Sequence, residues 1–260
     1  MNKVQQVFTE NEKVLVPYIS GGDPNLETTK KIILELDHSG AGIIEIGIPF
    51  SDPLADGPVI QKAGQRALKA GSSLKKIISL VAEISPRIET PLVLMGYYNN
   101  ILKYGREKFI ADILNAGISG VIIPDLPYDE DLKFYERLNS LDLAGILLVA
   151  PNTPDSRLEY LGNRSSGFLY CVSLLGVTGD QKGPYQKIEQ YINRVREKTE
   201  LPLGLGFGID GPQKARQVSK YVDGIIIGSA IINLIEEYEN RPEEMLAEIN
   251  SFVNSVVNAI

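Results

Sequence analysis

The sequence predicts an α/β protein folded as a closed (β/α)8 barrel, with an extra helix at each end of the chain. Eight short apolar segments alternate with longer segments whose apolar residues recur at helical spacing. Eight strand–helix units favour a closed parallel barrel. The length of 260 residues, 43% of them hydrophobic, suits one barrel with a full core. An open doubly wound sheet would require some of the strands to be assigned wrongly.

The predicted strands are short apolar runs, as expected for strands buried on both faces of a parallel sheet. They span residues 14–20, 42–47, 91–96, 120–125, 144–150, 167–172, 201–206 and 224–228. Helical patterns lie between them, for example at 26–36, 59–70, 74–84, 109–114 and 188–195. Pro24, Pro154 and Pro212 stand near helix starts, where the first helical turn tolerates proline.

Two further helices lie outside the repeat. Val4, Val7 and Phe8 fall on one side of a short helix that we expect to cover the lower end of the barrel. Residues 245–257 form a long amphipathic pattern that should pack on the outside. The sequence shows no domain boundary, so we expect residues 1–260 to form a single domain.

Composition argues against several classes of partner. The net charge is −7 and no Lys/Arg-rich block is present, so nucleic acid and anionic membranes are not expected partners. A single cysteine, Cys171, excludes an internal disulfide and suits a reducing compartment. We find no apolar run of membrane-spanning length and no secretion signal, and we expect a cytoplasmic protein.

The second predicted strand carries an unusual charge, because Glu45 stands in the middle of an apolar run. Burial costs a carboxylate several kcal/mol and raises its pKa, which suits a general acid or base. The loop that follows contains three prolines and two more carboxylates, Asp52 and Asp56. We expect Asp56 to reach over the same opening and Asp52 to order the loop by bonding its amides. A structural ion pair at Glu45 and a Mg²⁺ site made by all three carboxylates are the alternatives.

Other common catalytic groups are missing from the expected strand ends. The only histidine, His38, ends the first predicted barrel helix, where a cation complements the helix dipole. A Ser-His-Asp or Cys-His device therefore cannot be assembled. No lysine lies inside a predicted strand, which argues against a Schiff-base aldolase. Carboxylates and tyrosines therefore remain as the candidate catalytic groups.

Glycine-rich segments follow the last three predicted strands. Residues 204–212 follow the seventh strand, and Gly228 and Ser229 follow the eighth and begin a helix. Glycines there let backbone N–H groups approach an anion, and barrels of this type commonly hold phosphate at this place. A third segment, residues 176–184, has the composition of a lid. These segments together predict a phosphate site, although each could be a simple turn.

The segment 44–58, Ile-Glu-Ile-Gly-Ile-Pro-Phe-Ser-Asp-Pro-Leu-Ala-Asp-Gly-Pro, resembles the signature of the tryptophan synthase α subunit family. The resemblance continues at residues 16–24, 95–99, 124–127, 176–179, 206–209 and 228–230. It implies a TIM barrel and a carbon–carbon lyase that cleaves indole-3-glycerol phosphate into indole and glyceraldehyde 3-phosphate. The family passes indole to a β subunit, in an α2β2 heterotetramer, for the last step of L-tryptophan biosynthesis. It implies no metal or other cofactor for this chain.

The resemblance also implies roles for individual residues. The expected catalytic residues are Glu45, Asp56 and Tyr170. The expected substrate- and phosphate-binding residues are Tyr18, Thr178, Gly179, Gly208, Gly228 and Ser229, with Thr178 on the lid. Leu174 stands where several family members carry an arginine. Residues 49–58 and 99–105 are the expected contact with the β subunit.

Three other functions stay open at the level of sequence. The chain could release indole without a partner. It could be another phosphate-binding barrel enzyme, such as a sugar-phosphate isomerase or epimerase, which would need no apolar site for an aromatic ring. It could also be a non-catalytic subunit that binds a phosphorylated ligand, although such a subunit has no need of Glu45 inside an apolar strand.

Overall fold

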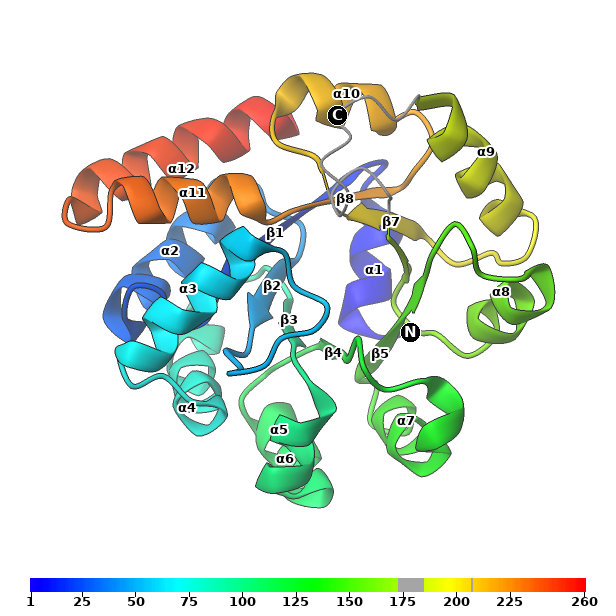
Figure 1. Cartoon of the computed structure of the whole chain (residues 1–260), viewed down its shortest axis with the longest axis horizontal. Helices are drawn as coiled ribbons and strands as arrows, with labels where there is room; N and C mark the ends of the chain where they lie inside the picture. Colours follow the sequence, from blue (N-terminus) through cyan, green and yellow to red (C-terminus); the bar gives the residue numbers. More distant parts are fainter. Residues whose placement is uncertain (173–184, 207) are drawn as a thin grey trace.

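A computed structural model of the chain describes residues 1–172, 185–206 and 208–260. Its strands form a closed parallel barrel in which each strand pairs with the next along the chain and the last pairs with the first (Figure 1). The strands are β1 Val14–Ser20, β2 Ile44–Gly47, β3 Leu92–Met95, β4 Gly120–Ile122, β5 Ala144–Val149, β6 Leu169–Val172, β7 Leu203–Gly206 and β8 Gly224–Ile227. All eight predicted strands are confirmed, several of them one to three residues shorter than predicted.

Helices surround the barrel (Figure 1). They are α1 Lys3–Glu10, α2 Leu26–His38, α3 Pro58–Lys69, α4 Leu74–Ile84, α5 Tyr98–Tyr104, α6 Arg106–Asn115, α7 Leu132–Asn139, α8 Asp155–Gly162, α9 Tyr185–Arg196, α10 Pro212–Val218, α11 Ser229–Glu237 and α12 Pro242–Val257. Short 3-10 turns lie at Ser85–Arg87 and Tyr128–Glu130. None of these helices is long and apolar enough to cross a membrane.

Two of the proline signals were interpreted wrongly. Pro212 is the first residue of α10, as predicted. Pro154 instead occupies the N-cap position of α8. Pro24 lies outside α2 altogether, because Asn25 caps that helix by accepting a hydrogen bond from the Thr28 amide. A side-chain cap and a proline give similar signals within two or three residues of a helix start.

Helix α1 closes the lower end of the barrel, as the sequence predicted. Val4 is fully buried among the inward-facing side chains of the strands. The Phe8 ring lies 5.5 Å from the ring of Phe168, measured between centroids, and Phe168 points inward from the edge of β6. A Cβ at Gly224 would lie 3.0 Å from the Phe8 ring, so a larger residue there would press against α1.

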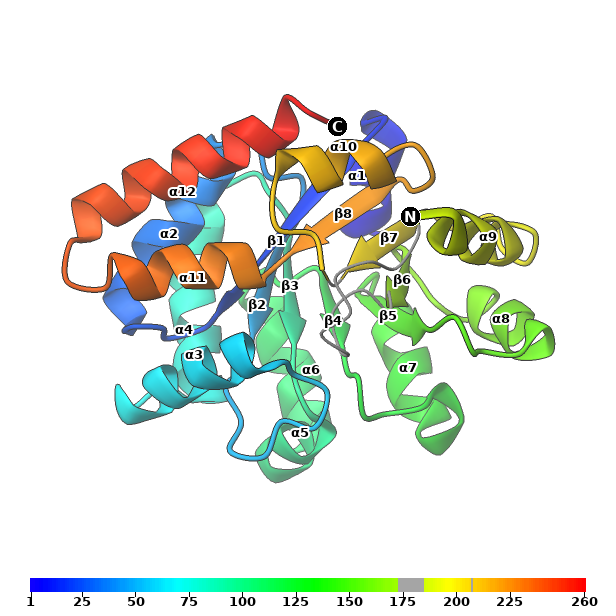
Figure 2. The same ribbon diagram turned by 45° about the horizontal axis from the view of Figure 1, so that its top comes forward.

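The C-terminal helix α12 packs on the outside beside α2, α10 and α11 (Figure 2). Its side chains Met245, Ile249 and Val253 are fully buried against the barrel layer. Asn250 joins it to α2 by donating hydrogen bonds to the Glu35 carboxylate at 2.7 Å and to the hydroxyl of Ser39, the C-cap residue of α2, at 2.9 Å. The predicted outer helix is therefore confirmed.

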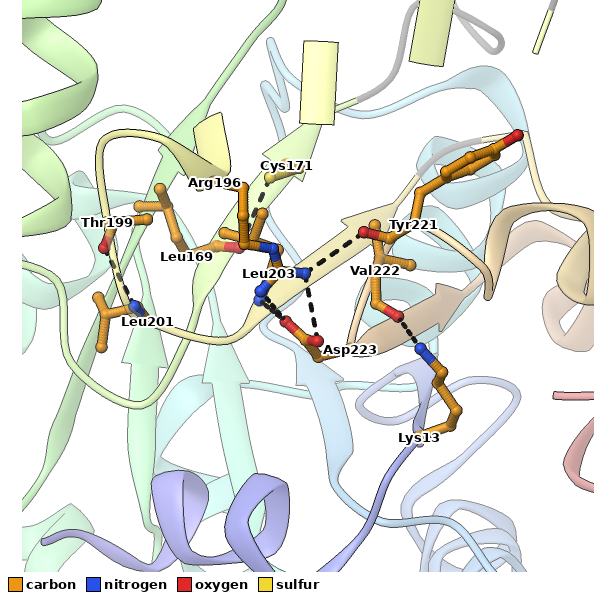
Figure 3. A network of polar contacts seen from close by, with 10 residues as sticks. All are labelled: Lys13, Leu169, Cys171, Arg196, Thr199, Leu201, Leu203, Tyr221, Val222 and Asp223. Atoms are coloured by element: carbon orange, nitrogen blue, oxygen red, sulfur yellow. Dashed lines mark hydrogen bonds and ion pairs between the residues drawn. The ribbon is translucent and has the colours of Figure 1, made fainter. Parts of the chain in front are cut away.

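A polar network ties the strand starts together at the base (Figure 3). Both carboxylate oxygens of Asp223 accept hydrogen bonds from the guanidinium of Arg196, at 2.7 and 3.2 Å. The backbone amide of Leu203 donates to the same carboxylate at 2.8 Å. Lys13 donates to the carbonyl of Val222 at 2.8 Å. These bonds link the starts of β1, β7 and β8.

Candidate active site

Glu45 lies in the middle of β2 and faces the barrel interior beside Tyr18 of β1 and Val93 of β3. It is completely buried, and neither carboxylate oxygen has a hydrogen-bond partner among the described residues. Burial, and secondly the charge of Asp56, raise the pKa of Glu45 to about 8. The carboxyl group is therefore mostly protonated at neutral pH, as a general acid must be. The alternative of a structural ion pair at Glu45 finds no partner among the described residues.

Asp56 lies on the loop between β2 and α3, immediately before Gly57, the N-cap residue of α3. Its side chain is half-buried. Burial raises the pKa of Asp56, and a hydrogen bond from the Tyr97 hydroxyl opposes that rise. The charge of Asp56 in turn raises the pKa of Glu45, so the two carboxyl groups belong to one electrostatic site.

Tyr97, at the end of β3, holds this loop, and sequence reasoning did not single it out. Its ring stacks on Phe50, with the centroids 5.1 Å apart. Its hydroxyl accepts a hydrogen bond from the Ala55 amide at 2.9 Å and also bonds to Asp56. Two signals in the sequence could have found it, namely its position just after a predicted strand and its place in the segment 95–99 that carries the family resemblance.

Asp52 does not order the loop in the way that was predicted. Its side chain is exposed, and it accepts a 2.5 Å hydrogen bond from the neighbouring Ser51 hydroxyl rather than bonds from backbone amides. The stiffness of the loop comes instead from its prolines and from Tyr97. Among the described residues no group of three or more acidic, histidine or cysteine side chains is placed to hold a metal ion, so the Mg²⁺ alternative has no ligand set there.

Two tyrosines, Tyr18 and Tyr170, project into the mouth around Glu45. A Cβ at Gly47 would lie 2.1 Å from the Tyr18 hydroxyl oxygen, and one at Gly206 would lie 2.4 Å from the Tyr170 hydroxyl oxygen. Each hydroxyl thus fills the space left by a missing side chain on the neighbouring strand. Burial raises the pKa of both tyrosines, and the charge of Glu45 adds to the effect, so both stay neutral donors.

Two glycines of the predicted phosphate-binding segment 204–212 make room for aromatic rings. Gly204 and Gly206 lie within β7, and their missing side chains make room for the rings of Phe168 and Tyr170. Gly208 lies beyond the strand with a φ of +78°, a conformation that favours glycine. Of these three glycines, only Gly208 is therefore placed to offer its backbone to a ligand at the mouth of the barrel.

The start of α11 presents backbone donors at the mouth that have no partner among the described residues. Gly228 is its N-cap and Ser229 its first residue, and the first hydrogen bond of the helix runs from the Ile232 amide to the Gly228 carbonyl at 3.0 Å. The amides before Ile232 point out of the helix start, where the dipole favours an anion. The ring of Tyr18 borders this helix start, 3.2 Å from where a Gly228 Cβ would be.

Some predicted residues lie outside the described part of the chain. These are Thr178 and Gly179 of the expected phosphate site, Leu174, and the rest of the predicted lid at 176–184. The structure brings together the other predicted residues at one end of the barrel. They are Tyr18, Glu45, Asp56, Tyr170, Gly208, Gly228 and Ser229.

Comparisons with known proteins agree with this arrangement. The family described as "Tryptophan synthase alpha chain" matches residues 4–260. A protein of that name from Petrotoga mobilis is 54% identical over 256 residues, which cover 98% of this chain and 99% of the relative. A crystal structure of tryptophan synthase subunit alpha from Legionella pneumophila superposes with a TM-score of 0.93 at 34% identity, covering 100% of this chain and 98% of that one. A chain from a study of mutual activation in the tryptophan synthase α2β2 complex of Pyrococcus furiosus gives 0.87 at 34% identity, covering 94% and 98%.

Proposed function

This chain belongs to the tryptophan synthase alpha chain family, and from that premise we propose how its own residues carry the family's reaction. The protein is a carbon–carbon lyase of tryptophan biosynthesis that cleaves indole-3-glycerol phosphate. The isomerase and the non-catalytic subunit considered from sequence are thereby set aside. We propose that residues 1–260 act as one catalytic domain in the cytoplasm.

Glu45 is the general acid and base of this proposal, supported by its burial without a partner. Cleavage is a retro-aldol step, in which the electron pair of the bond between indole C3 and the glycerol carbon passes to the ring. Glu45 first gives its proton to C3 and is left as a carboxylate. It then takes the proton of the hydroxyl on the departing carbon, which becomes the aldehyde of glyceraldehyde 3-phosphate. Glu45 ends protonated, so the cycle balances, and such transfers typically contribute about 10²–10⁴-fold.

Asp56 stabilises the charge that appears on the ring. When C3 gains a proton the indole becomes a positively charged indolenine, and its N–H becomes a stronger donor. An ionised Asp56 that accepts this N–H favours the charged state over the ground state. Tyr97 supports this role by holding the loop and by bonding to the carboxylate. Tyr170 completes the wall beside Glu45.

The phosphate end of the substrate lies against the start of α11 in this proposal. Amides at Gly228 and Ser229, together with Gly208, supply donors, and the helix dipole supplies a positive partial charge. We assign Thr178 and Gly179 to the same group from the family resemblance alone. Binding the phosphate far from the reacting bond fixes the orientation of the ring over Glu45.

Tryptophan synthase alpha chains pair with beta subunits. We propose that this chain forms an α2β2 heterotetramer and passes indole to its partner. Residues 49–58 and 99–105 are the proposed contact. Leu54 supports this, because its side chain is 94% exposed on the loop that carries Asp56, an unusual place for a large apolar residue.

The decisive experiment measures indole release from indole-3-glycerol phosphate by the purified chain, alone and mixed with a β subunit. Glu45→Gln should lower the rate by about 10²–10⁴-fold while substrate binding changes little, because the amide keeps the shape of the carboxyl and loses its proton. Asp56→Asn should also be severely impaired. Robust activity in Glu45→Gln would reject the assignment, and an unchanged rate with the β subunit would reject the proposed coupling.

A further inference from the structure

Tyr18 is the side chain of the neighbouring strand that pairs in register with Glu45. The two residues face the interior from β1 and β2, and adjacent strands lie about 4.8 Å apart. The Tyr18 hydroxyl lies over Gly47, 2.1 Å from where a Cβ would be. Gly47 is two residues beyond Glu45, about 6–7 Å along the strand. The phenol oxygen therefore lies about one interior layer nearer the mouth than the backbone of Glu45.

This position matters in the middle of the proposed reaction. Once Glu45 has given its proton to C3, a carboxylate is left in a completely buried place, with no hydrogen-bond donor to either oxygen among the described residues. An unpaired buried charge is costly, and its cost would fall directly on the proton transfer. A neutral donor within reach of that carboxylate would reduce the cost only after the proton has left.

The titratable groups that face Glu45 come from several elements. Among the described residues they are Asp56 on the loop after β2, Tyr170 on β6 and Tyr18 on β1, and Tyr97, just beyond β3, faces Asp56. Asp56 is an acceptor and repels a second carboxylate. Tyr97 already bonds to Asp56 and accepts from the Ala55 amide. Tyr170 leans toward β7, where its hydroxyl fills the space at Gly206.

We propose that Tyr18 is a positioning residue for the acid–base step, whose hydroxyl donates a hydrogen bond to the Glu45 carboxylate once that group has lost its proton. A small rotation of the Glu45 side chain toward the mouth would bring its oxygens to the phenol. The inference rests on the proposed function, because it requires Glu45 to ionise during the reaction.

The test is Tyr18→Phe, which removes one oxygen atom and leaves the ring that packs at Gly228. Rates of indole release are measured from about pH 6 to pH 10, with and without a β subunit. We expect kcat to fall by about tenfold to a hundredfold, because a hydrogen bond to a charged group is lost. We also expect the alkaline limb of kcat/KM to move to higher pH, since a carboxylate without this donor holds its proton more tightly.

Tyr191→Phe is the matched control. Tyr191 is also a buried tyrosine, but it lies on α9, and its hydroxyl donates to the Val149 carbonyl at 2.8 Å. The same chemical change there should leave the pH profile unmoved. A general loss of packing in Tyr18→Phe would lower the rate without raising the alkaline limb, so an unmoved limb, or an unchanged kcat, overturns the inference.

Glu45→Gln, assayed beside these variants, separates the two ideas. If Glu45→Gln stays active, the proposed acid–base role fails and the inference fails with it. If Glu45→Gln is inactive while Tyr18→Phe behaves like the unmodified chain, only the role of Tyr18 is wrong.

Discussion

Glu45 and Asp223 are carboxylic acids associated with opposite ends of the same barrel, and their surroundings differ in every respect. Asp223, at the base, keeps about a third of its side chain exposed and is held by Arg196 and by the Leu203 amide (Figure 3). Glu45, below the mouth, is fully buried and has no partner among the described residues. One carboxylate is placed where its charge is easily tolerated and is then paired, whereas the other is placed where its charge is penalised and is left alone.

The contrast separates stability from chemistry. A paired carboxylate at the base joins helix α9 and the start of β7 to the residue before β8, and can stabilise the barrel. An unpaired buried carboxyl contributes nothing comparable, and its only evident use is a proton held near neutral pH. Barrels of this architecture place stability at the lower face and reactions at the upper one. If the two residues divide the work in this way, substitutions at Glu45 and at Asp223 should change different measured quantities.

The largest effect concerns the pH dependence of stability at Glu45. Its pKa is raised to about 8 in the folded chain, against about 4.3 in an unfolded one. Between these values the folded state holds a proton that the unfolded state has lost, so the contribution of Glu45 to stability is greatest below about pH 4 and falls as pH rises. From about pH 5 to pH 8 the free energy of unfolding should fall by roughly 1.4 kcal/mol per pH unit relative to Glu45→Gln.

Denaturant unfolding of both proteins at several pH values measures this slope. Asp56, whose pKa is also raised, is present in both proteins and cancels from the difference. Equal slopes would mean that Glu45 is ionised and solvated in the folded chain, and the contrast with Asp223 would then disappear.

The next effect concerns stability at the base. Asp223→Ala removes the acceptor for Arg196 and for the Leu203 amide, and should cost about 2 kcal/mol of unfolding free energy after allowance for partial exposure. Indole release by the folded protein should keep its kcat. Asp155→Ala is the control, since the 3.6 Å contact of Asp155 with Arg194 joins two partly exposed side chains and, together with the place of Asp155 in the first turn of α8, should be worth no more than about 1 kcal/mol. A large loss of kcat in Asp223→Ala would show that the base also serves the chemistry.

Much of this division could be predicted from the sequence. The strands are apolar on both faces and are separated by helical patterns, so the barrel followed from periodicity alone. Glu45 stood out because a charge inside such a run has few explanations. The same reasoning placed the helix of Val4 and Phe8 under the barrel, where the structure has it.

The details that the sequence left out depend on contacts between distant segments. Nothing local distinguishes the inward glycines Gly204 and Gly206, which make room for rings from β6, from a glycine that serves a ligand. The ion pair between Arg196 and Asp223, at the base of the barrel, joins residues 27 positions apart. Asp52 was predicted to order the loop because short acidic side chains often do so, but it bonds only to the neighbouring Ser51 hydroxyl. The residue that holds the loop is Tyr97, which accepts a hydrogen bond from the amide of Ala55, 42 positions earlier in the chain.

The smallest effect concerns Tyr97, whose hydroxyl holds the loop at the mouth by hydrogen bonds, as the Asp223 carboxylate does at the base. Tyr97→Phe keeps the stack on Phe50 but leaves the Ala55 amide and Asp56 without the hydroxyl. We expect kcat/KM to fall by about tenfold, equivalent to losing one ordinary hydrogen bond. Because that hydrogen bond lowers the pKa of Asp56, its removal should also move the acidic limb of kcat/KM to higher pH.

Tyr98→Phe is the matched control for this prediction. Tyr98 is the next residue, and its hydroxyl bonds to Asp131, which already pairs with Arg106 and caps α7. Losing that hydroxyl should leave the acidic limb in place. If both variants moved the limb equally, the loop would be responding to general loosening of α5. A shift confined to Tyr97→Phe would mean that a hydrogen bond lowers the pKa of one carboxyl at the mouth, Asp56, whereas burial and the charge of Asp56 raise the pKa of the other, Glu45.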